Sequence, residues 1–334
     1  MKRIGQSTLE FSAPPTVLSH AAIGGKKEAE GPLGADFDQT FQDTSLTMES
    51  WEKAEAQLQK EAVTLAIEKS GMTAQQMDFI FAGDLLNQCI SSTFGLLDFQ
   101  IPFLGQYGAC STMAQTLLMA AMTVESGAAE RAVAVTSSHF CSAERQFRTP
   151  LEYGSQRTPT AQWTATASGS IVVGKGGAIK IRHGLAGRIV DLGVKDPANM
   201  GAAMAPAAAD SIYRYLSDTG TKPQDYDGIY TGDLGLVGTT LLYQSLEDNG
   251  VDIRQVHNDC GLLLYDREAQ DVHAGASGCG CSASVLCGHL LKRMESGNLR
   301  NILFCATGAL MSPTSQQQGE AIPGVCHVLH LTTE

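Results

Sequence analysis

Apolar positions along this chain switch repeatedly between helical spacing and short continuous runs. In residues 45–71, apolar side chains recur every three or four positions, which predicts an amphipathic helix that ends at a glycine. Residues 78–83 (DFIFAG) follow as a short strand that is apolar on both faces, as in a sheet covered on both sides. Alternation of this kind predicts an α/β protein whose sheets carry helices on both faces. The same order of helix and strand recurs at 110–126 and 131–137, at 203–218 and 227–231, and at 282–296 and 301–307.

The chain also contains an internal repeat. KSGMTAQQMDFIFAGDL at 69–85 is echoed by DTGTKPQDYDGIYTGDL at 218–234, with agreement at glycine, aspartate and apolar positions. A second echo follows in the same order, between 109–137 and 281–307, and both of its copies contain Glu-Ser-Gly. Two echoes in the same order predict a duplicated fold. The alternative is that any helix–glycine–strand unit gives a likeness of this kind.

Composition and charge narrow the function classes. The chain has 334 residues, a length natural for two units, and 43% hydrophobic residues, enough for a substantial core. Its net charge of −12 argues against nucleic acid and against simple electrostatic docking on an anionic membrane. The start, MKRIGQSTLEFS, lacks the apolar run of a signal peptide, and no apolar stretch is long enough to span a bilayer. Nine cysteines without an export signal are typical of reduced thiols in a cytosol-like compartment.

The stretch GQYGACSTMAQT, at 105–116, carries the first candidate chemistry. A turn bounded by glycines delivers Cys110 to the start of the apolar helix predicted over 110–126. A helix N-terminus lowers the pKa of a cysteine thiol, and its N–H groups, here those of Thr112 and Met113, can hold an anion. From these residues alone, Cys110 is a nucleophile, the remnant of one, or a small residue in a crowded turn.

A duplicated α/β plan with a cysteine opening the central helix of its first half resembles the thiolase and ketoacyl-synthase superfamily, from about residue 45 to the end. The resemblance implies a thiolase-like fold of two duplicated halves, 1–178 and 179–334, each a mixed sheet covered by helices in the layer order α-β-α-β-α. Within that superfamily the chain is identified as a member of the stage V sporulation protein AD family by four long strings: GQYGACSTMAQT, TSSHFCSAERQFRTPLEYGSQRTPTAQWTATASGSIVVG, VHNDCGLLLYDREAQDVHAGASGCGCSAS and LFCATGALMSPTSQQQGEAIPGVCHVL.

This resemblance also implies a function and partners. It implies a part in moving dipicolinic acid into the developing spore of a Bacillus-like bacterium, together with membrane-embedded proteins of the same transport system. A chain without a membrane span would then lie peripherally on the cytoplasmic side of the forespore or spore inner membrane. Superfamily members pair through the edge strand of the first half, so we expect a homodimer in which 131–137 or its neighbour supplies that edge.

The residues that thiolase chemistry needs beside the cysteine are missing. The superfamily carries histidine or asparagine at two positions that hold the acyl carbonyl and move protons. This chain reads TGDLG at the first, which places Gly232 and Asp233 there, and ASGCGCSAS at the second, which places Cys279 there. An aspartate donates a hydrogen bond only when protonated, its charge raises the pKa of a nearby thiol, and cysteine is a weak donor. We therefore expect ligand binding; the alternatives are an acyl-CoA-dependent transferase or condensing enzyme that uses Cys110, and a scaffold.

The expected binding site is a cleft over Cys110, between the two halves. Dipicolinate is a flat ring with two carboxylates, and small side chains leave room for it. Asp84 and Asp233 would repel a bare dianion but suit a ligand that arrives with calcium, because calcium takes carboxylate oxygens from protein and ligand together. No resident metal or cofactor is expected. The predicted ligand-binding residues are Cys110, Ser111, Asp84, Asp233, Cys279, Cys281 and His139.

Structural alternatives stand beside these assignments. A histidine at a strand end, such as His139, is more often a satisfied structural residue, and symmetry of the repeat explains the two aspartates as well as function does. The pair Cys279 and Cys281 lacks a second pair at zinc-site spacing, which favours a tight turn before a helix. The carboxylates of the ligand have a second possible location, the arginine cluster Arg145, Arg148 and Arg157.

Overall fold

The structure, a computed structural model that describes residues 1–147 and 157–334, contains two matching half-sheets joined edge to edge. Strands follow the order β12-β11-β14-β15-β10-β3-β9-β7-β5-β6, and the halves meet where β10 pairs with β3. Outward from this junction, each half has two antiparallel pairings followed by two parallel ones. This shared pattern is what a duplicated sequence predicts.

The strands have the following bounds. Those of the first half are β3 (Thr16–Gly24), β5 (Phe79–Gly83), β6 (Phe103–Gly105), β7 (Ala132–Ser138) and β9 (Ala167–Gly174). Those of the second half are β10 (Ile179–Leu185), β11 (Gly228–Thr231), β12 (His257–Asp259), β14 (Asn301–Ala309) and β15 (Gly324–Thr332). Shorter strands are β1 (Lys2–Ile4), β2 (Thr8–Glu10), β4 (Gln39–Thr40), β8 (Trp163–Thr164) and β13 (Ala276–Ser277), the last two pairing with each other.

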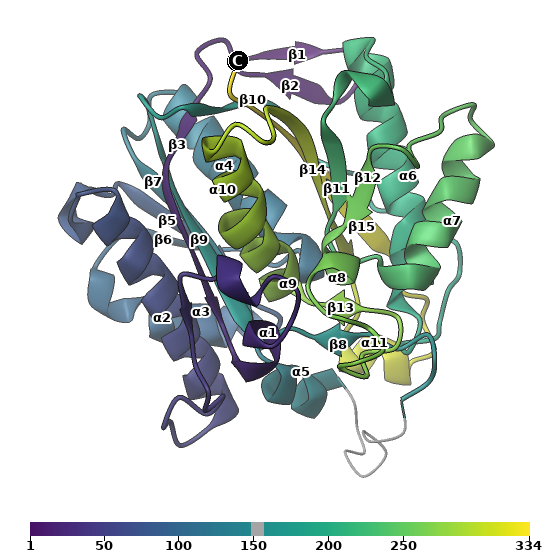
Figure 1. The fold of residues 1–334 in the computed structure, drawn as a ribbon, viewed down its shortest axis with the longest axis horizontal. Coiled ribbons are helices and arrows are strands. Elements are labelled where there is room, and N and C mark those ends of the chain that lie inside the picture. The colour runs from purple at the N-terminus through teal and green to yellow at the C-terminus, as the bar shows by residue number, and fades with distance from the viewer. Residues whose placement is uncertain (148–156) are drawn as a thin grey trace.

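Helices cover both faces of both half-sheets (Figure 1). Helix α2 (Trp51–Lys69) packs outside the first half, and α6 (Met200–Thr219) packs outside the second. Between the half-sheets lies α4 (Thr112–Glu125), which contacts strands of both. The predicted thiolase-like layer order α-β-α-β-α is thereby confirmed. The remaining helices are α1 (Lys26–Ala29), α3 (Ile90–Gly95), α5 (Phe140–Phe147), α7 (Gly235–Glu247), α8 (Cys260–Leu263), α9 (Cys279–Ser284), α10 (Leu291–Glu295) and α11 (Pro313–Gln317).

Residues that recur in the sequence repeat perform the same structural task in each half. Gly71 and Gly220 follow α2 and α6 with φ of 71° and 68°, a left-handed conformation that glycine adopts without strain. The carboxylate of Asp78 accepts hydrogen bonds from the backbone N–H groups of Glu130 and Arg131. Asp227 accepts the equivalent pair in the second half, from Arg300 and Asn301. The repeat therefore encodes the turns that connect helix, strand and neighbouring strand.

Two sequence expectations need correction. Strand β7, predicted over 131–137 as a possible dimer edge, is buried between β5 and β9, and the edge of the first half is β6. The helix predicted over 282–296 begins earlier, at Cys279, and contains a π-helical segment, Val285–Leu290, between α9 and α10. In the part of the chain that the structure describes, no helix has both the length and the apolar character that a membrane crossing requires.

Candidate functional site

Cys110 lies in a tight turn against which the second half packs. The 3-10 turn Ala109–Ser111 precedes α4, so Cys110 stands just before the helix and not within it. Ala109 has a φ of 49°, a left-handed conformation that costs an L residue about 1–3 kcal/mol. Strand β14 passes so close that a Cβ added to Gly308 would lie 2.3 Å from the carbonyl oxygen of Gly108. Contacts between the two halves therefore hold the turn in its strained form.

The thiol of Cys110 is buried in surroundings that keep it protonated. The residue is 4% exposed and packs among Leu85, Ala143 and Cys279. Burial raises the pKa of the Cys110 thiol well above its ordinary value, and the negative charge of Asp233 raises it further. The hydroxyl oxygen of Ser277 lies 4.0 Å from the sulfur of Cys110. Among the described residues neither histidine nor asparagine hydrogen-bonds to this sulfur, so the group that would activate a nucleophile is missing there.

Asp233 ties the Cys110 site together from the second half. Its carboxylate is completely buried and accepts hydrogen bonds from the Ser277 hydroxyl at 3.1 Å, the Gly278 N–H at 2.9 Å and the Thr307 hydroxyl at 3.1 Å. Burial outweighs these donors and raises the pKa of Asp233 to about 6. This side chain joins β14 to the turn before α9, which is a structural task.

Asp84, at the equivalent repeat position, has different partners. Its carboxylate accepts hydrogen bonds from the backbone N–H of Leu86 at 2.9 Å and from both the N–H and the hydroxyl of Ser92, at 2.8 and 2.6 Å. It therefore shapes the loop after β5. The carboxylate oxygens of the two aspartates thus accept hydrogen bonds from donors within the protein, in two separate parts of the chain. The described residues contain no group of three or more histidine, cysteine, aspartate or glutamate side chains placed to hold a metal. This geometry offers calcium no ligand set from Asp84 and Asp233.

Small residues around Cys279 and Cys281 serve close packing. A Cβ on Gly280 would lie 2.3 Å from the carbonyl oxygen of Ala167, so α9 rests directly on β9. The Cys279 thiol donates to the carbonyl oxygen of Ser137 at 2.9 Å. Both cysteines are fully buried, and burial raises the pKa of each thiol. All nine cysteines are free thiols.

The remaining predicted site groups are also engaged internally. His139 uses both ring nitrogens, Nε2 with the carbonyl oxygen of Thr44 at 2.8 Å and Nδ1 with the N–H of Cys141 at 3.1 Å. The Ser111 hydroxyl is buried and donates to the carbonyl oxygen of Gly108 at 2.7 Å. The N–H of Thr112, expected to face an anion, donates to Ala109. The structure thus gathers Cys110, Ser111, Asp233 and Cys279 in one place, with Asp84 and His139 in supporting roles nearby in the first half.

A hollow of about 480 Å³ adjoins this place on the side of α5. Leu86 and Ser142 in its wall are the chain neighbours of Leu85 and Ala143, two members of the Cys110 packing cluster. Its lining comes from four parts of the chain that meet here: Glu52, Leu86, Asn87, Gln88, Ile90, Ser142, Arg145, Gln146 and Pro313.

The predicted arginine cluster does not gather in one location. Arg145 pairs with Glu52 beside this hollow, whereas Arg157 pairs with Asp271. Arg148 lies outside the described residues.

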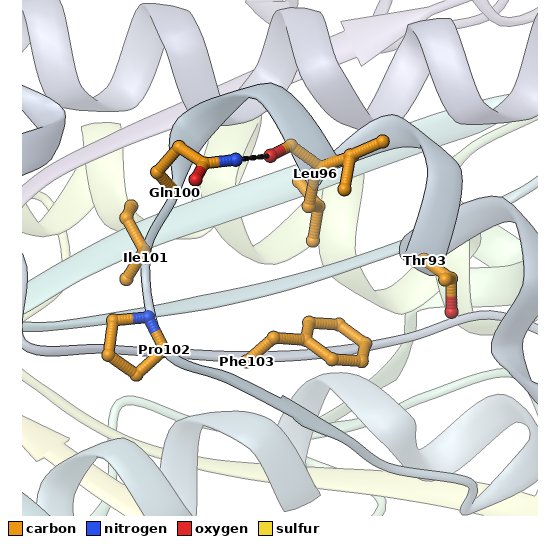
Figure 2. Close-up of a pocket in the computed structure, with 7 residues that line it drawn as sticks. Thr93, Leu96, Gln100, Ile101, Pro102 and Phe103 are labelled. Carbon is orange, nitrogen blue, oxygen red and sulfur yellow. Dashed lines mark hydrogen bonds between the residues drawn. The ribbon is translucent and has the colours of Figure 1, made fainter.

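A second hollow lies between α3 and the edge strand β6 (Figure 2). It encloses about 460 Å³ and has largely apolar walls that include Leu96, Ile101 and Phe103. Phe94 and Leu104, the chain neighbours of the lining residues Thr93 and Phe103, are exposed apolar side chains. This surface belongs to the edge of the first half and not to the Cys110 site.

Sequence reasoning missed two buried residues that support the site. Glu55 on α2 is completely buried and accepts hydrogen bonds from the hydroxyls of Ser142 at 2.6 Å and Ser137 at 3.2 Å. Burial, followed by the charge of Asp84, raises the pKa of Glu55. Gln59, one helical turn later, donates to the carbonyl oxygen of Gly83. The available signal was their i, i+4 spacing within the alanine-rich face of the helix.

Comparison with solved structures defines the class of protein. The chain superposes on OleA of Xanthomonas campestris bound to cerulenin with a TM-score of 0.63 (12% identity, 97% of this chain and 100% of that one). It also superposes on 3-oxoacyl-(acyl carrier protein) synthase III of Pseudomonas aeruginosa PAO1 (TM-score 0.58, 13% identity, 96% and 98%) and on human mitochondrial 3-ketoacyl-CoA thiolase in complex with CoA (TM-score 0.57, 12% identity, 98% and 100%). At these identities the likeness establishes a thiolase-like fold.

The family follows from sequence. The profile of Stage V sporulation protein AD (SpoVAD) matches residues 5–332. Stage V sporulation protein AD of Bacillus subtilis (strain 168) is 44% identical over 328 residues, covering 98% of this chain and 97% of that protein. The chain therefore belongs to the SpoVAD family of sporulation proteins, as the four sequence strings predicted.

Proposed function

We propose that this chain binds dipicolinic acid beside Cys110 and supports its uptake into the developing spore, without turning over an acyl substrate. The observation that carries the proposal is a thiolase-like site whose cysteine is buried and protonated and, among the described residues, lacks the partners that catalysis needs. Membership of a sporulation family supports spore formation as the process in which the ligand is bound. Dipicolinate needs a protein that recognises it without changing it, and this site fits that requirement.

The central experiment is calorimetric titration of the full chain with dipicolinate, with and without calcium, beside an acetyl-CoA control. We expect saturable binding of dipicolinate and none of acetyl-CoA. Cys110→Leu adds bulk against Ser277 and should abolish binding, while Cys141→Leu adds the same bulk at a half-buried position on α5 and should not. Absence of dipicolinate binding by the unaltered protein would leave the scaffold interpretation in place of this one.

The Cys110 thiol is expected to accumulate no acyl group. Its pKa is raised, and each oxyanion donor missing from such a site typically costs about a hundredfold or more in rate. Intact-mass spectrometry after incubation with acetyl-CoA and longer acyl-CoAs checks this, with a 3-oxoacyl synthase as the positive control. An acyl adduct that disappears in Cys110→Ser would favour the acyltransferase alternative.

We also propose that the chain forms a homodimer through the edge strand β6. This edge leaves its outer backbone groups unpaired, and it is flanked by the exposed apolar side chains of Phe94, Leu97 and Leu104. An apolar edge of this kind pairs with another strand or aggregates. A second copy related by a two-fold axis would extend the sheet and cover these side chains.

Leu104→Lys is expected to convert the dimer to monomer at micromolar concentration, because it places a charge in the paired edge. Leu236→Lys is the matched control, since Leu236 on α7 is 46% exposed, against 47% for Leu104. Sedimentation equilibrium measures the mass of both variants. A monomeric unaltered protein, or a dimer that survives Leu104→Lys, would contradict the proposal.

Peripheral attachment at the cytoplasmic side of the spore inner membrane, through membrane-embedded proteins of the same transport system, is the cellular part of the proposal. It is supported by the sporulation family and by the net charge of −12, which disfavours direct binding to anionic lipid. Co-purification from sporulating cells with and without detergent-solubilised membranes tests it.

A further inference from the structure

Two cations face one indole at the edge of the Cys110 site. The rings of Trp163 and Phe140 stack with centroids 3.9 Å apart and planes 10° apart, which covers one face of the indole. Lys27 Nζ lies 4.3 Å from the centroid of Trp163, and Arg157 Cζ lies 4.8 Å from it. Because a stacked ring occupies one face, both cations belong to the other. Residues from three distant parts of the sequence thus converge on one ring.

This pair of cations is only partly neutralised. Arg157 is 9% exposed; its Nη2 donates to the carbonyl and carboxylate oxygens of Asp271, at 2.8 and 3.0 Å, while its buried Nη1 has no hydrogen-bond partner among the described residues. Lys27 Nζ donates to the carbonyl oxygen of Gln270 at 2.6 Å. Burial lowers the pKa of Lys27, and the charge of Arg157 lowers it further. A buried guanidinium N–H without an acceptor is costly, and an anion would satisfy it.

The position of the indole links these cations to Cys110. Strand β8 pairs with β13 so that Trp163 stands opposite Ala276 and Thr164 opposite Ser277, the residue whose hydroxyl lies 4.0 Å from the Cys110 sulfur. The ionisable groups that act on the Cys110 thiol are Asp233 and Cys279, both anionic when charged. A carboxylate ligand at Cys110 therefore needs its positive partner from outside that cluster. The cations over Trp163 stand one residue along β8 from Thr164, the partner of Ser277, on the other face of the pair because side chains alternate along a strand.

We propose that Lys27 and Arg157, held over Trp163, form a carboxylate anchor at the edge of the Cys110 site, and that they bind one carboxylate of a flat aromatic dicarboxylate. The identity of the ligand rests on the proposed function; the anchor itself does not. The cations contact the carboxylate through Nη1 of Arg157 and the two N–H groups of Lys27 not used by Gln270. Trp163 orients them and is not itself a stacking platform, since both of its faces are occupied.

The test is titration of Lys27→Gln and Arg157→Gln with dipicolinate, beside Lys26→Gln, an adjacent lysine whose side chain is 56% exposed and pairs with the similarly exposed Glu30. Loss of one charge-assisted hydrogen bond predicts about tenfold weaker binding or more for the first two variants and none for the third. Arg145→Gln tests the other arginine site. Unchanged affinity in Lys27→Gln and Arg157→Gln, or loss in Arg145→Gln alone, would overturn the anchor.

A second readout separates the anchor from the proposed function. The chain has two tryptophans, so Trp51→Phe leaves Trp163 as the sole indole reporter. Its fluorescence is titrated with dipicolinate and with benzene-1,3-dicarboxylate, in the presence and absence of Arg157→Gln. A saturable change with the benzene compound alone, lost in Arg157→Gln, would support the anchor while the dipicolinate proposal fails. No change with either dicarboxylate would overturn the anchor.

Discussion

Asp233→Ala is expected to lower the free energy of unfolding by about 3 kcal/mol or more. The substitution leaves the buried donors of Ser277, Gly278 and Thr307 without their acceptor, and each unsatisfied buried group costs about 1–3 kcal/mol. The lower end applies because the two hydroxyls can rotate toward other acceptors, whereas the N–H of Gly278 cannot. Urea unfolding at neutral pH measures the change. A loss below about 1 kcal/mol would mean that Asp233 does not join the two elements.

Asp233→Asn is the matched control, because it keeps the shape and one acceptor oxygen. The pKa of Asp233 is raised to about 6 from an ordinary value of 3.8. A raised pKa means that the folded protein holds the proton more tightly, so the contribution of this group is complete below pH 3.8 and is lost as pH rises through 6. Asn carries no such titration. Relative to the unaltered protein, Asp233→Asn should therefore be more stable at pH 8 than at pH 5, and the same difference at both would contradict the assignment.

Gly308→Ala is expected to destabilise the fold by about 2–3 kcal/mol and to remove ligand binding. Its Cβ would stand 2.3 Å from the carbonyl oxygen of Gly108 and 3.0 Å from the N–H nitrogen of Ser111, both backbone atoms of the Cys110 turn. Backbone cannot rotate aside as a side chain can, so the turn itself must move.

Gly105→Ala supplies the comparison for that change. There the added Cβ meets only the ring edge of Phe103, at 3.2 Å, on the exposed strand β6. Thermal unfolding and dipicolinate titration of both variants measure the effect. Equal behaviour of the two would show that the contact between β14 and the Cys110 turn is not tight in solution.

Much of the fold was predictable because its signals are local. Helix α2 stops just before Gly71, the glycine predicted to end it, and the strand expected over 78–83 is β5. Both depend on apolar spacing and on a left-handed glycine, which neighbouring residues determine. The edge strand of the first half was predicted wrongly. An apolar strand such as β7 has the same pattern of apolar residues whether it lies in the middle of a sheet or at its edge.

The site was predictable in its membership but not in its chemistry. Cys110 and Asp233 do meet, as the resemblance to the thiolase superfamily implied. Asp84 and Asp233 share a repeat position yet bind different partners, because Asp84 accepts from Ser92 on α3, whereas Asp233 accepts from Gly278 before α9 and from Thr307 on β14. The small residues of CGC were read as room for a ligand, and the structure uses Gly280 to bring α9 against β9.

The sequence by itself determined the order of elements, the duplication, the turns at Asp78 and Asp227, and the loss of the catalytic histidine and asparagine. Each of these features follows from the types of residues and from short spacings between them in the sequence. Only the tertiary structure decided that the Cys110 thiol stays protonated, that Asp233 is a buried acceptor, and that Lys27 and Arg157 share one face of Trp163. The physical reason is that burial and electrostatic interaction depend on distances between groups far apart in the chain, and those distances exist only after the two halves have packed together.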